Sequence, residues 1–201
     1  MIRRLLLFLP LFAAGCGGLL APSGPSPALY RLDAPRAVSA AGPAAPWQLL
    51  IDKPTATLAL DTTRIAIVPA PNRMDYYADV AWADKAPAML QELILQAFDR
   101  SGRIQAVQRQ GGGLKADYIL AVDLQDFEVD AASSPANVHV RLTGRLVRTR
   151  DRAIVASRMF DTTAPIGSGG FDGVIASFNQ AVSELLPELV GWTLAEGGRN
   201  P

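Results

Sequence analysis

The stretch that decides the fold is "YILAVDLQDFEV", which runs from Tyr118 to Val129. Apolar residues recur at every second position over most of it, the pattern of a β-strand that buries one face. A second alternating stretch, Val138 to Val147, follows after the turn-rich "DAASSPAN". Two alternating stretches joined in this way predict an antiparallel hairpin. The phase of the first stretch shifts near its end, which predicts a β-bulge near Gln125.

Further strands and two helices are predicted on either side of this hairpin. The apolar positions of "APAMLQELILQAF" recur at helical spacing, with Asp84 as the predicted N-cap, and Gly102 is expected to end that helix. A second amphipathic helix runs from Phe171 to Trp192, and Pro187 within it is expected to kink or split it. The predicted strands are "LYRLD", "WQLLID", "RIAIV", "IQAVQ" and "AIVASRMFDTTAP".

These elements are expected to form one domain that spans residues 29–197. The strands and helices do not alternate as regular βαβ units, which favours an α+β fold over a parallel α/β fold. We therefore predict a mostly antiparallel sheet with two main helices packed on one face. About half of the residues are hydrophobic, so a chain of this length can bury a substantial core.

The N-terminus carries the features of a secretion signal. Arg3 and Arg4 precede an apolar run, Leu5 to Ala14, that is shorter than the roughly 20 residues needed to span a bilayer. The run ends in Ala-Ala-Gly-Cys, which resembles the lipobox of bacterial lipoproteins and contains Cys16, the only cysteine of the chain. The resemblance implies a lipoprotein signal peptide at residues 1–15. The alternative, an uncleaved helix with an incidental cysteine, fits so short a run less well.

Cys16 is then the lipidation site and the first residue of the mature chain. In bacterial lipoproteins the thiol receives a diacylglycerol and the new amino group is acylated, with palmitate as a typical chain, so several acyl chains hold the protein at the membrane. Gly17, where Asp would favour inner-membrane retention, implies an outer-membrane lipoprotein that faces the periplasm. Residues 16–28 are expected to form a flexible tether with a reach of about 40 Å.

Charge and histidine content argue against several classes of function. The chain has 19 basic and 19 acidic residues and no long basic run, so nothing indicates binding to nucleic acid. His139 is the only histidine, and Cys16 is used by the anchor, so no catalytic triad is indicated. We expect His139 to be a solvated strand residue, and we expect no catalytic residues, no metal site and no cofactor.

Charged residues also gather on the two strands of the predicted hairpin. Its arginines could form a patch for anionic lipid headgroups. If the strands pair around the turn, however, acidic and basic residues lie roughly opposite each other, which favours cross-strand ion pairs. The arginines are Arg141, Arg145, Arg148, Arg150 and Arg152, and the acidic residues are Asp123, Asp126, Glu128 and Asp130.

Several stretches, in order along the chain, resemble one known family over nearly the whole mature domain. They are "LYRLD", "LDTTRIAIV", "YYADVAWADKAPAMLQELILQAF" followed by "SGR", "LKADYILAVDLQDFE" and "IVASRMF". Together they resemble the ABC-type transport auxiliary lipoproteins, a family that includes the paraquat-inducible protein C type. The resemblance implies a non-enzymatic lipoprotein that serves an ABC transporter for lipid traffic across the cell envelope. It also implies docking to the mammalian-cell-entry (MCE) domain protein of that transporter.

Tyr76, Tyr77 and Trp82 are the most distinctive part of this resemblance. Aromatic side chains are favoured anchors at protein interfaces, so these three are candidate partner contacts. The alternative is that they pack in the core between a strand edge and the first helix. The alternative function is a structural or assembly lipoprotein of an envelope or secretion complex. The sequence leaves open whether the domain binds phospholipid and whether it forms a homo-oligomer.

Overall fold

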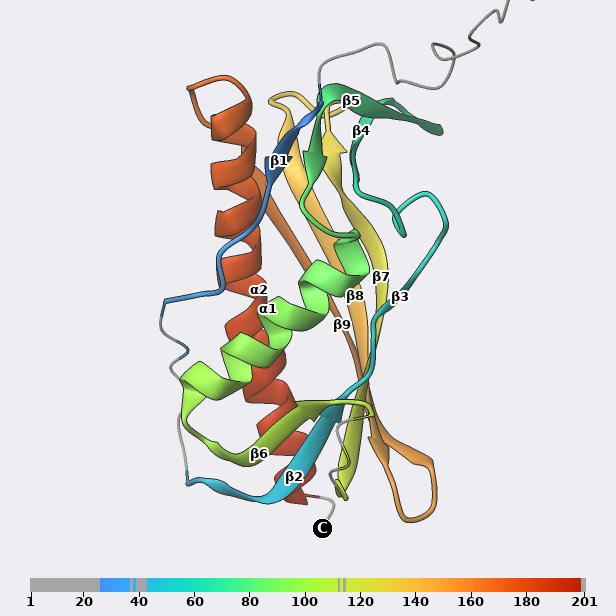
Figure 1. The fold of residues 1–201 in the computed structure, drawn as a ribbon, viewed down its shortest axis with the longest axis vertical. Helices are drawn as coiled ribbons and strands as arrows, with labels where there is room; N and C mark the ends of the chain where they lie inside the picture. Colours follow the sequence, from blue (N-terminus) through green and yellow to red (C-terminus); the bar gives the residue numbers. More distant parts are fainter. Residues whose placement is uncertain (1–25, 37, 39–42, 112, 114, 200–201) are drawn as a thin grey trace, which may run out of the picture.

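The predicted hairpin forms a long antiparallel ladder. In the computed structural model, which describes residues 26–36, 38, 43–111, 113 and 115–199, β7 (Tyr118–Asp130) pairs with β8 (Asn137–Arg148) (Figure 1). The register shifts by one residue at Gln125, so the predicted bulge is confirmed. β9 (Ala153–Pro165), which is also predicted as a strand, pairs antiparallel with β8, so the three strands form a meander.

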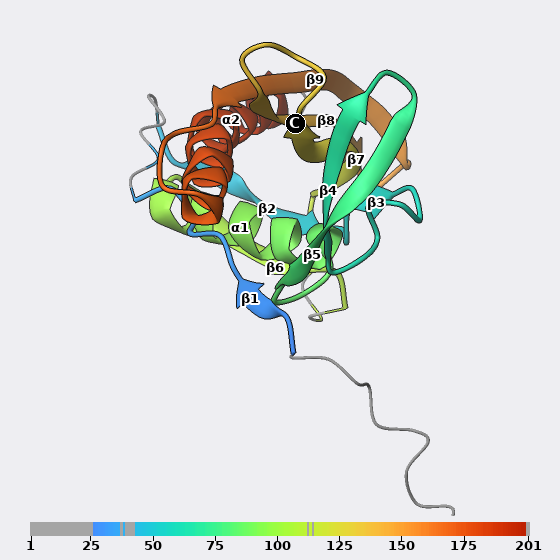
Figure 2. The same ribbon diagram turned by 90° about the horizontal axis from the view of Figure 1, so that it is seen from above.

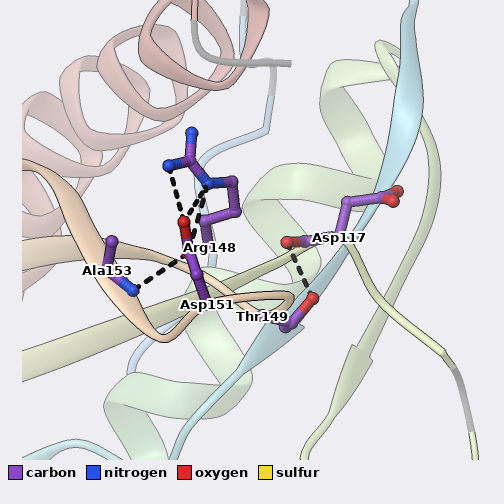
Figure 3. A network of polar contacts seen from close by, with 5 residues as sticks. All are labelled: Asp117, Arg148, Thr149, Asp151 and Ala153. Atoms are coloured by element: carbon purple, nitrogen blue, oxygen red, sulfur yellow. Dashed lines mark hydrogen bonds and ion pairs between the residues drawn. The ribbon is translucent and has the colours of Figure 1, made fainter.

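A polar network holds the turn between β8 and β9 (Figure 3). The Arg148 guanidinium donates to both carboxylate oxygens of Asp151, and Oδ1 of Asp151 accepts the backbone N–H of Ala153 at 3.2 Å. The Thr149 hydroxyl donates to the carbonyl oxygen of Asp117 at 3.0 Å, next to the start of β7. Contacts within the chain therefore fix this turn and engage Arg148.

The other edge of β7 is shared by three short strands that run parallel to it. β2 pairs with the beginning of β7, β3 with its middle and β4 with its end. β6 extends the sheet beyond β2 in parallel, while β5 pairs antiparallel with β4 and carries β1, in parallel, at its outer edge. The bounds are β1 (Ala28–Tyr30), β2 (Ala45–Ile51), β3 (Thr55–Ala56), β4 (Arg64–Ala70), β5 (Arg73–Trp82) and β6 (Ile104–Arg109).

The sheet is therefore mixed, although its longest ladders are antiparallel as predicted. The parallel pairs arise because β2, β4 and β7 reach their neighbours through long crossovers rather than hairpins. β5 is missing from the sequence-based prediction. Asp79 adopts a left-handed φ of 58°, and the β4–β5 register shifts between Arg64 and Ala66, so β5 has no regular alternation to detect.

Both predicted helices are present. α1 (Ala86–Ser101) has Pro87 in its first turn and ends at Gly102, whose φ of 60° closes the helix in the left-handed conformation. The N-cap is Lys85 rather than Asp84, because the Asp84 carboxylate accepts only the N–H of the adjacent Lys85. α2 (Phe171–Arg199) is one continuous helix, so Pro187 does not split it.

The two helices share one core with the sheet. Viewed from above, the sheet is strongly curved, and α2 lies beside β9 and β8 (Figure 2). A Cβ at Gly144 of β8 would lie 3.1 Å from Cδ1 of Leu189, so this glycine lets the helix approach the strand closely. The apolar stripes of both helices join the same buried cluster. Within the described ranges, neither helix has a stretch long and apolar enough to cross a membrane.

Candidate functional site

The predicted lipidation site lies outside the described residues. Cys16, the signal peptide and most of the tether belong to residues 1–25, and the described chain starts at residue 26, just before β1. β1 is an outer strand of the sheet and pairs with the end of β5. β1, β5 and the elements that they touch are therefore the parts of the domain that adjoin the predicted tether.

Trp82, a candidate partner contact, is buried. The residue is only 1% exposed at the end of β5. Its ring stands edge-on to Phe178 of α2, with centroids 5.0 Å apart, and lies 5.6 Å from the ring of Phe127 on β7. The core-packing alternative thus describes Trp82, which joins β5, β7 and α2.

Tyr77 lies in a partly exposed group of rings, which we call the aromatic corner (Tyr30, Tyr77 and Phe171). The Phe171 ring at the start of α2 contacts Tyr77 at 4.9 Å and Tyr30 at 5.1 Å between centroids. The Tyr30 hydroxyl donates to Asp172 at 3.3 Å, whereas among the described residues none is found that binds the Tyr77 hydroxyl. Partial burial raises the pKa of Tyr77. The corner thus offers apolar ring surface and one free hydroxyl beside β1.

Tyr76 points to the opposite face of the sheet. Its hydroxyl donates to the carbonyl oxygen of Ala59 at 3.1 Å, and the Arg64 guanidinium lies 3.6 Å above its ring centroid. Tyr76 is opposite Ala66 on β4, and Ala66 is in turn opposite Glu128 on β7. Tyr76 and Tyr77 therefore cannot serve one contact surface, because successive residues of this strand segment face opposite sides.

Only some of the charged residues that the sequence places on the hairpin form ion pairs or hydrogen bonds with each other or with their neighbours. Arg141 forms the predicted cross-strand ion pair, with Nη2 2.5 Å from Oδ2 of Asp126. Asp123 instead accepts a hydrogen bond from the Thr55 hydroxyl at 2.8 Å. Asp130 accepts the hydroxyl and backbone N–H of Ser133 in the β7–β8 turn, and these hydrogen bonds lower its pKa. The ion-pair hypothesis is therefore confirmed for one pair and wrong for these other two carboxylates.

His139 is less solvated than expected. Its side chain is 22% exposed, and Nε2 lies 2.8 Å from Oδ1 of Asp161 on β9. Glu128 is directly opposite on β7, and Asp126 follows on the same face. The cause of the lower exposure is position, since His139 lies on a strand that is flanked by β7 and β9 along its length. Counting outward from the predicted turn would have revealed the Glu128–His139 pair.

A groove of about 520 Å³ lies between α1 and the segment after β1. Arg100 and Arg109 line it, but both are engaged within the chain. Arg100 donates to the carbonyl oxygens of Ala34 and Pro35 at 2.6 and 2.8 Å, and Arg109 pairs with Glu92. These contacts attach the segment to α1, and they leave neither guanidinium as an obvious site for an anionic ligand.

Solved structures resemble this chain along most of its length. The crystal structure of protein XCC0632 from Xanthomonas campestris is 35% identical, with a TM-score of 0.81, and the match covers 86% of this chain and 97% of that one. The hypothetical protein CT253 from Chlamydia trachomatis shares the fold alone, at 11% identity and a TM-score of 0.55, over 78% of this chain and 100% of that one.

Sequence comparison assigns the family. A protein of Bradyrhizobium diazoefficiens, bll6063, which is described as uncharacterized, is 29% identical over 165 residues. These are 82% of this chain but 44% of that protein, so this chain spans less than half the length of that relative. The family model described as ABC-type transport auxiliary lipoprotein component matches residues 30–190, from β1 into the second half of α2. The chain therefore belongs to the family of ABC-type transport auxiliary lipoprotein components.

Proposed function

We propose that this lipoprotein is an outer-membrane-anchored, non-enzymatic component of an MCE-type ABC system for lipid transport. It acts in the periplasm by docking to the MCE-domain protein of that system. The observation that carries the proposal is the family match over residues 30–190, which covers the folded domain from β1 into the second half of α2. The lipobox-like segment that ends at Cys16 supplies the anchor.

The arrangement of the domain supports docking over lipid capture. The apolar stripes of α1 and α2 are buried against the sheet, so they are not available to enclose acyl chains. The aromatic corner, by contrast, keeps its rings partly exposed and lies next to β1, where the tether enters. Tyrosine and phenylalanine at such a position are suited to anchor a protein partner. The corner is therefore the proposed contact surface, with Tyr77 at its centre.

Photo-crosslinking in cells tests this proposal. A photoreactive amino acid replaces Tyr77 in one strain and Glu188 in a control strain, since Glu188 is 63% exposed on α2 and outside the corner. We expect the MCE-domain protein to be captured from position 77 and not from position 188. Capture of secretion components instead would support the assembly-lipoprotein alternative. Capture of the MCE protein from both positions, or from neither, would contradict docking through the aromatic corner.

A further inference from the structure

A histidine and two carboxylates converge on the face of the sheet that points away from α2. On β8, Gly144 and the even-numbered residues near it face the core, so His139 and Arg141 face the other side. Glu128 is directly opposite His139, and Asp126 is on the same face of β7 beyond the bulge. One ligand atom from each of Asp126, Glu128 and His139 lies within 4.8 Å of the other two.

Glu128 is the unusual member of this group. Only 8% of the residue is exposed, and among the described residues no hydrogen bond to its carboxylate is found. Burial raises the pKa of Glu128, and the nearby Asp126 raises it further, while His139 and Arg141 lower it without offsetting the rise. A buried carboxylate that lacks a hydrogen-bond donor is costly unless a proton or a cation neutralises it. A bound proton or cation would therefore stabilise Glu128 in this position.

Asp161 orients the imidazole from the other side. It lies on β9, and its Oδ1 is 2.8 Å from Nε2 of His139. When Nε2 carries the proton and donates it to Asp161, Nδ1 is the nitrogen with a lone pair. A carboxylate that holds the distal N–H of a histidine is the usual support of a metal-ligating imidazole, because it fixes the tautomer and strengthens the ligand.

The charges around the group favour a divalent cation. Three carboxylates, on Asp126, Glu128 and Asp161, face one permanent positive charge, on Arg141. Asp130, the next acidic residue of β7, is taken up by Ser133 in the turn. Arg141 contacts Oδ2 of Asp126, which leaves Oδ1 of the same carboxylate for another partner. With His139 neutral, as a metal ligand must be, a divalent cation brings the net charge of the group to zero.

We propose that Asp126, Glu128 and His139 bind one divalent transition-metal cation, for which Zn²⁺ is the best match. One imidazole nitrogen and two carboxylate oxygens form a ligand set that Zn²⁺ accepts at about 2.0–2.2 Å, with water in the fourth position. The three ligand atoms lie within 4.8 Å of one another, so the side chains must move closer together to reach that geometry. The ion links β7 directly to β8 next to their connecting turn.

The test uses the full chain in detergent, with Cys16→Ser to remove the only thiol and without a histidine tag. Because His139 is the only histidine, the imidazole signals in an NMR spectrum report on this site alone. We expect one equivalent of Zn²⁺ to shift these signals, to remain bound during dialysis against metal-free buffer, and to raise the Tm by about 5 °C or more. Mg²⁺ at the same concentration should produce a much smaller response, since it prefers all-oxygen sites.

Variants separate a built site from adventitious binding. Glu128→Gln and His139→Gln should each abolish stoichiometric Zn²⁺ binding, while Asp161→Asn should weaken it about 10–100-fold. Glu188→Gln removes one carboxylate from the exposed side of α2 and should leave binding unchanged. Circular dichroism in EDTA establishes that each variant is folded. The proposal is overturned if the parent chain binds no stoichiometric Zn²⁺, or if folded Glu128→Gln or His139→Gln binds it as the parent does.

Discussion

The indole of Trp47 fills the space beside Gly197 in which any larger residue would place its Cβ. A Cβ at Gly197 would lie 2.4 Å from Cζ2 of Trp47, well inside van der Waals contact. Trp47 is on β2 and Gly197 is near the end of α2, so this contact fixes the last turns of the helix against the sheet. The Tyr118 hydroxyl donates to the Gly197 carbonyl oxygen at 3.2 Å and strengthens the same junction.

Gly197→Ala should therefore destabilise the domain, although alanine is the better helix former. We expect a loss of about 1–3 kcal/mol in the free energy of unfolding, because the indole must move out of a packed position. The matched control is Gly191→Ala in the same helix, where a Cβ meets nothing within 4 Å. That change should stabilise by up to about 1 kcal/mol. Equal effects of the two substitutions in urea unfolding would show that the Trp47 contact is not tight.

Much of the fold is predictable from the sequence because strong periodicity marks its largest elements. The alternation of β7, β8 and β9 and the helical stripes of α1 and α2 reflect burial on one face, which local sequence records directly. β5 is not predicted because the irregularity at Asp79 changes, halfway along the strand, which alternate side chains face the core. β2 and β4 are predicted as strands, but their parallel pairing with β7 is not, since pairing between distant strands leaves no local pattern. β3 has only two residues and is not predicted either.

The candidate sites are only partly predictable. The burial of Trp82 depends on Phe127 and Phe178, which are distant in sequence, so its aromatic character alone could not separate core from surface. The aromatic corner also needs Phe171, a residue that the sequence assigns only to a helix stripe. The position of Glu128 opposite His139 follows from the hairpin register, but the burial that makes it notable comes from the surrounding strands.

Glu128 should give the stability of the protein a distinct pH dependence in the absence of metal. Its pKa is raised in the folded state, so as pH rises above about 4 the unfolded state releases this proton first. The raised pKa thus favours folding at low pH, and that contribution is lost as pH rises through the folded-state value. Glu128→Gln cannot ionise and avoids this loss. In EDTA, the Tm of Glu128→Gln relative to that of wild type should increase between pH 4 and 7. The increase should be about 2–4 °C for each kcal/mol of unfolding free energy that wild type loses when Glu128 ionises.

The contrary result would be two pH profiles that stay parallel over this range. Asp130 and Asp151 do not disturb the comparison, since both are present in the two proteins. Their pKa values are lowered by Ser133 and by Arg148 respectively, so they stabilise the fold at higher pH in wild type and variant alike. The difference between the profiles therefore reports on Glu128 together with its interactions with Asp126, Asp130, His139 and Arg141.

The proposed lipid anchor depends on one atom, the Sγ of Cys16. Cys16→Ser cannot form the thioether to diacylglycerol, so we expect an uncleaved precursor that incorporates no labelled palmitate. Gly17→Ala keeps the thiol and serves as the control, with labelling as in wild type. Palmitate incorporation that persists in Cys16→Ser would contradict the assignment of this residue.

Trp82→Ala should lower stability rather than weaken partner binding directly. Removal of the indole leaves a cavity between β5, β7 and α2, for which we expect a loss of about 3–5 kcal/mol. Urea unfolding measures this loss. Tyr77→Ala removes a half-exposed ring and should cost less. If Trp82→Ala unfolds at the same urea concentration as wild type, the ring does not hold these elements together.

Binding of the mature lipoprotein to the MCE-domain protein of the same organism tests the central claim most directly. Both proteins are purified in detergent, and affinity is measured by biolayer interferometry alongside phospholipid analysis of the lipoprotein. We predict saturable binding at micromolar concentration or below, weakened at least about 10-fold by Tyr77→Ala, unchanged by Glu188→Gln, and little co-purifying phospholipid. Stoichiometric phospholipid on the lipoprotein with no measurable binding to the MCE protein would contradict the docking account and indicate a lipid carrier instead.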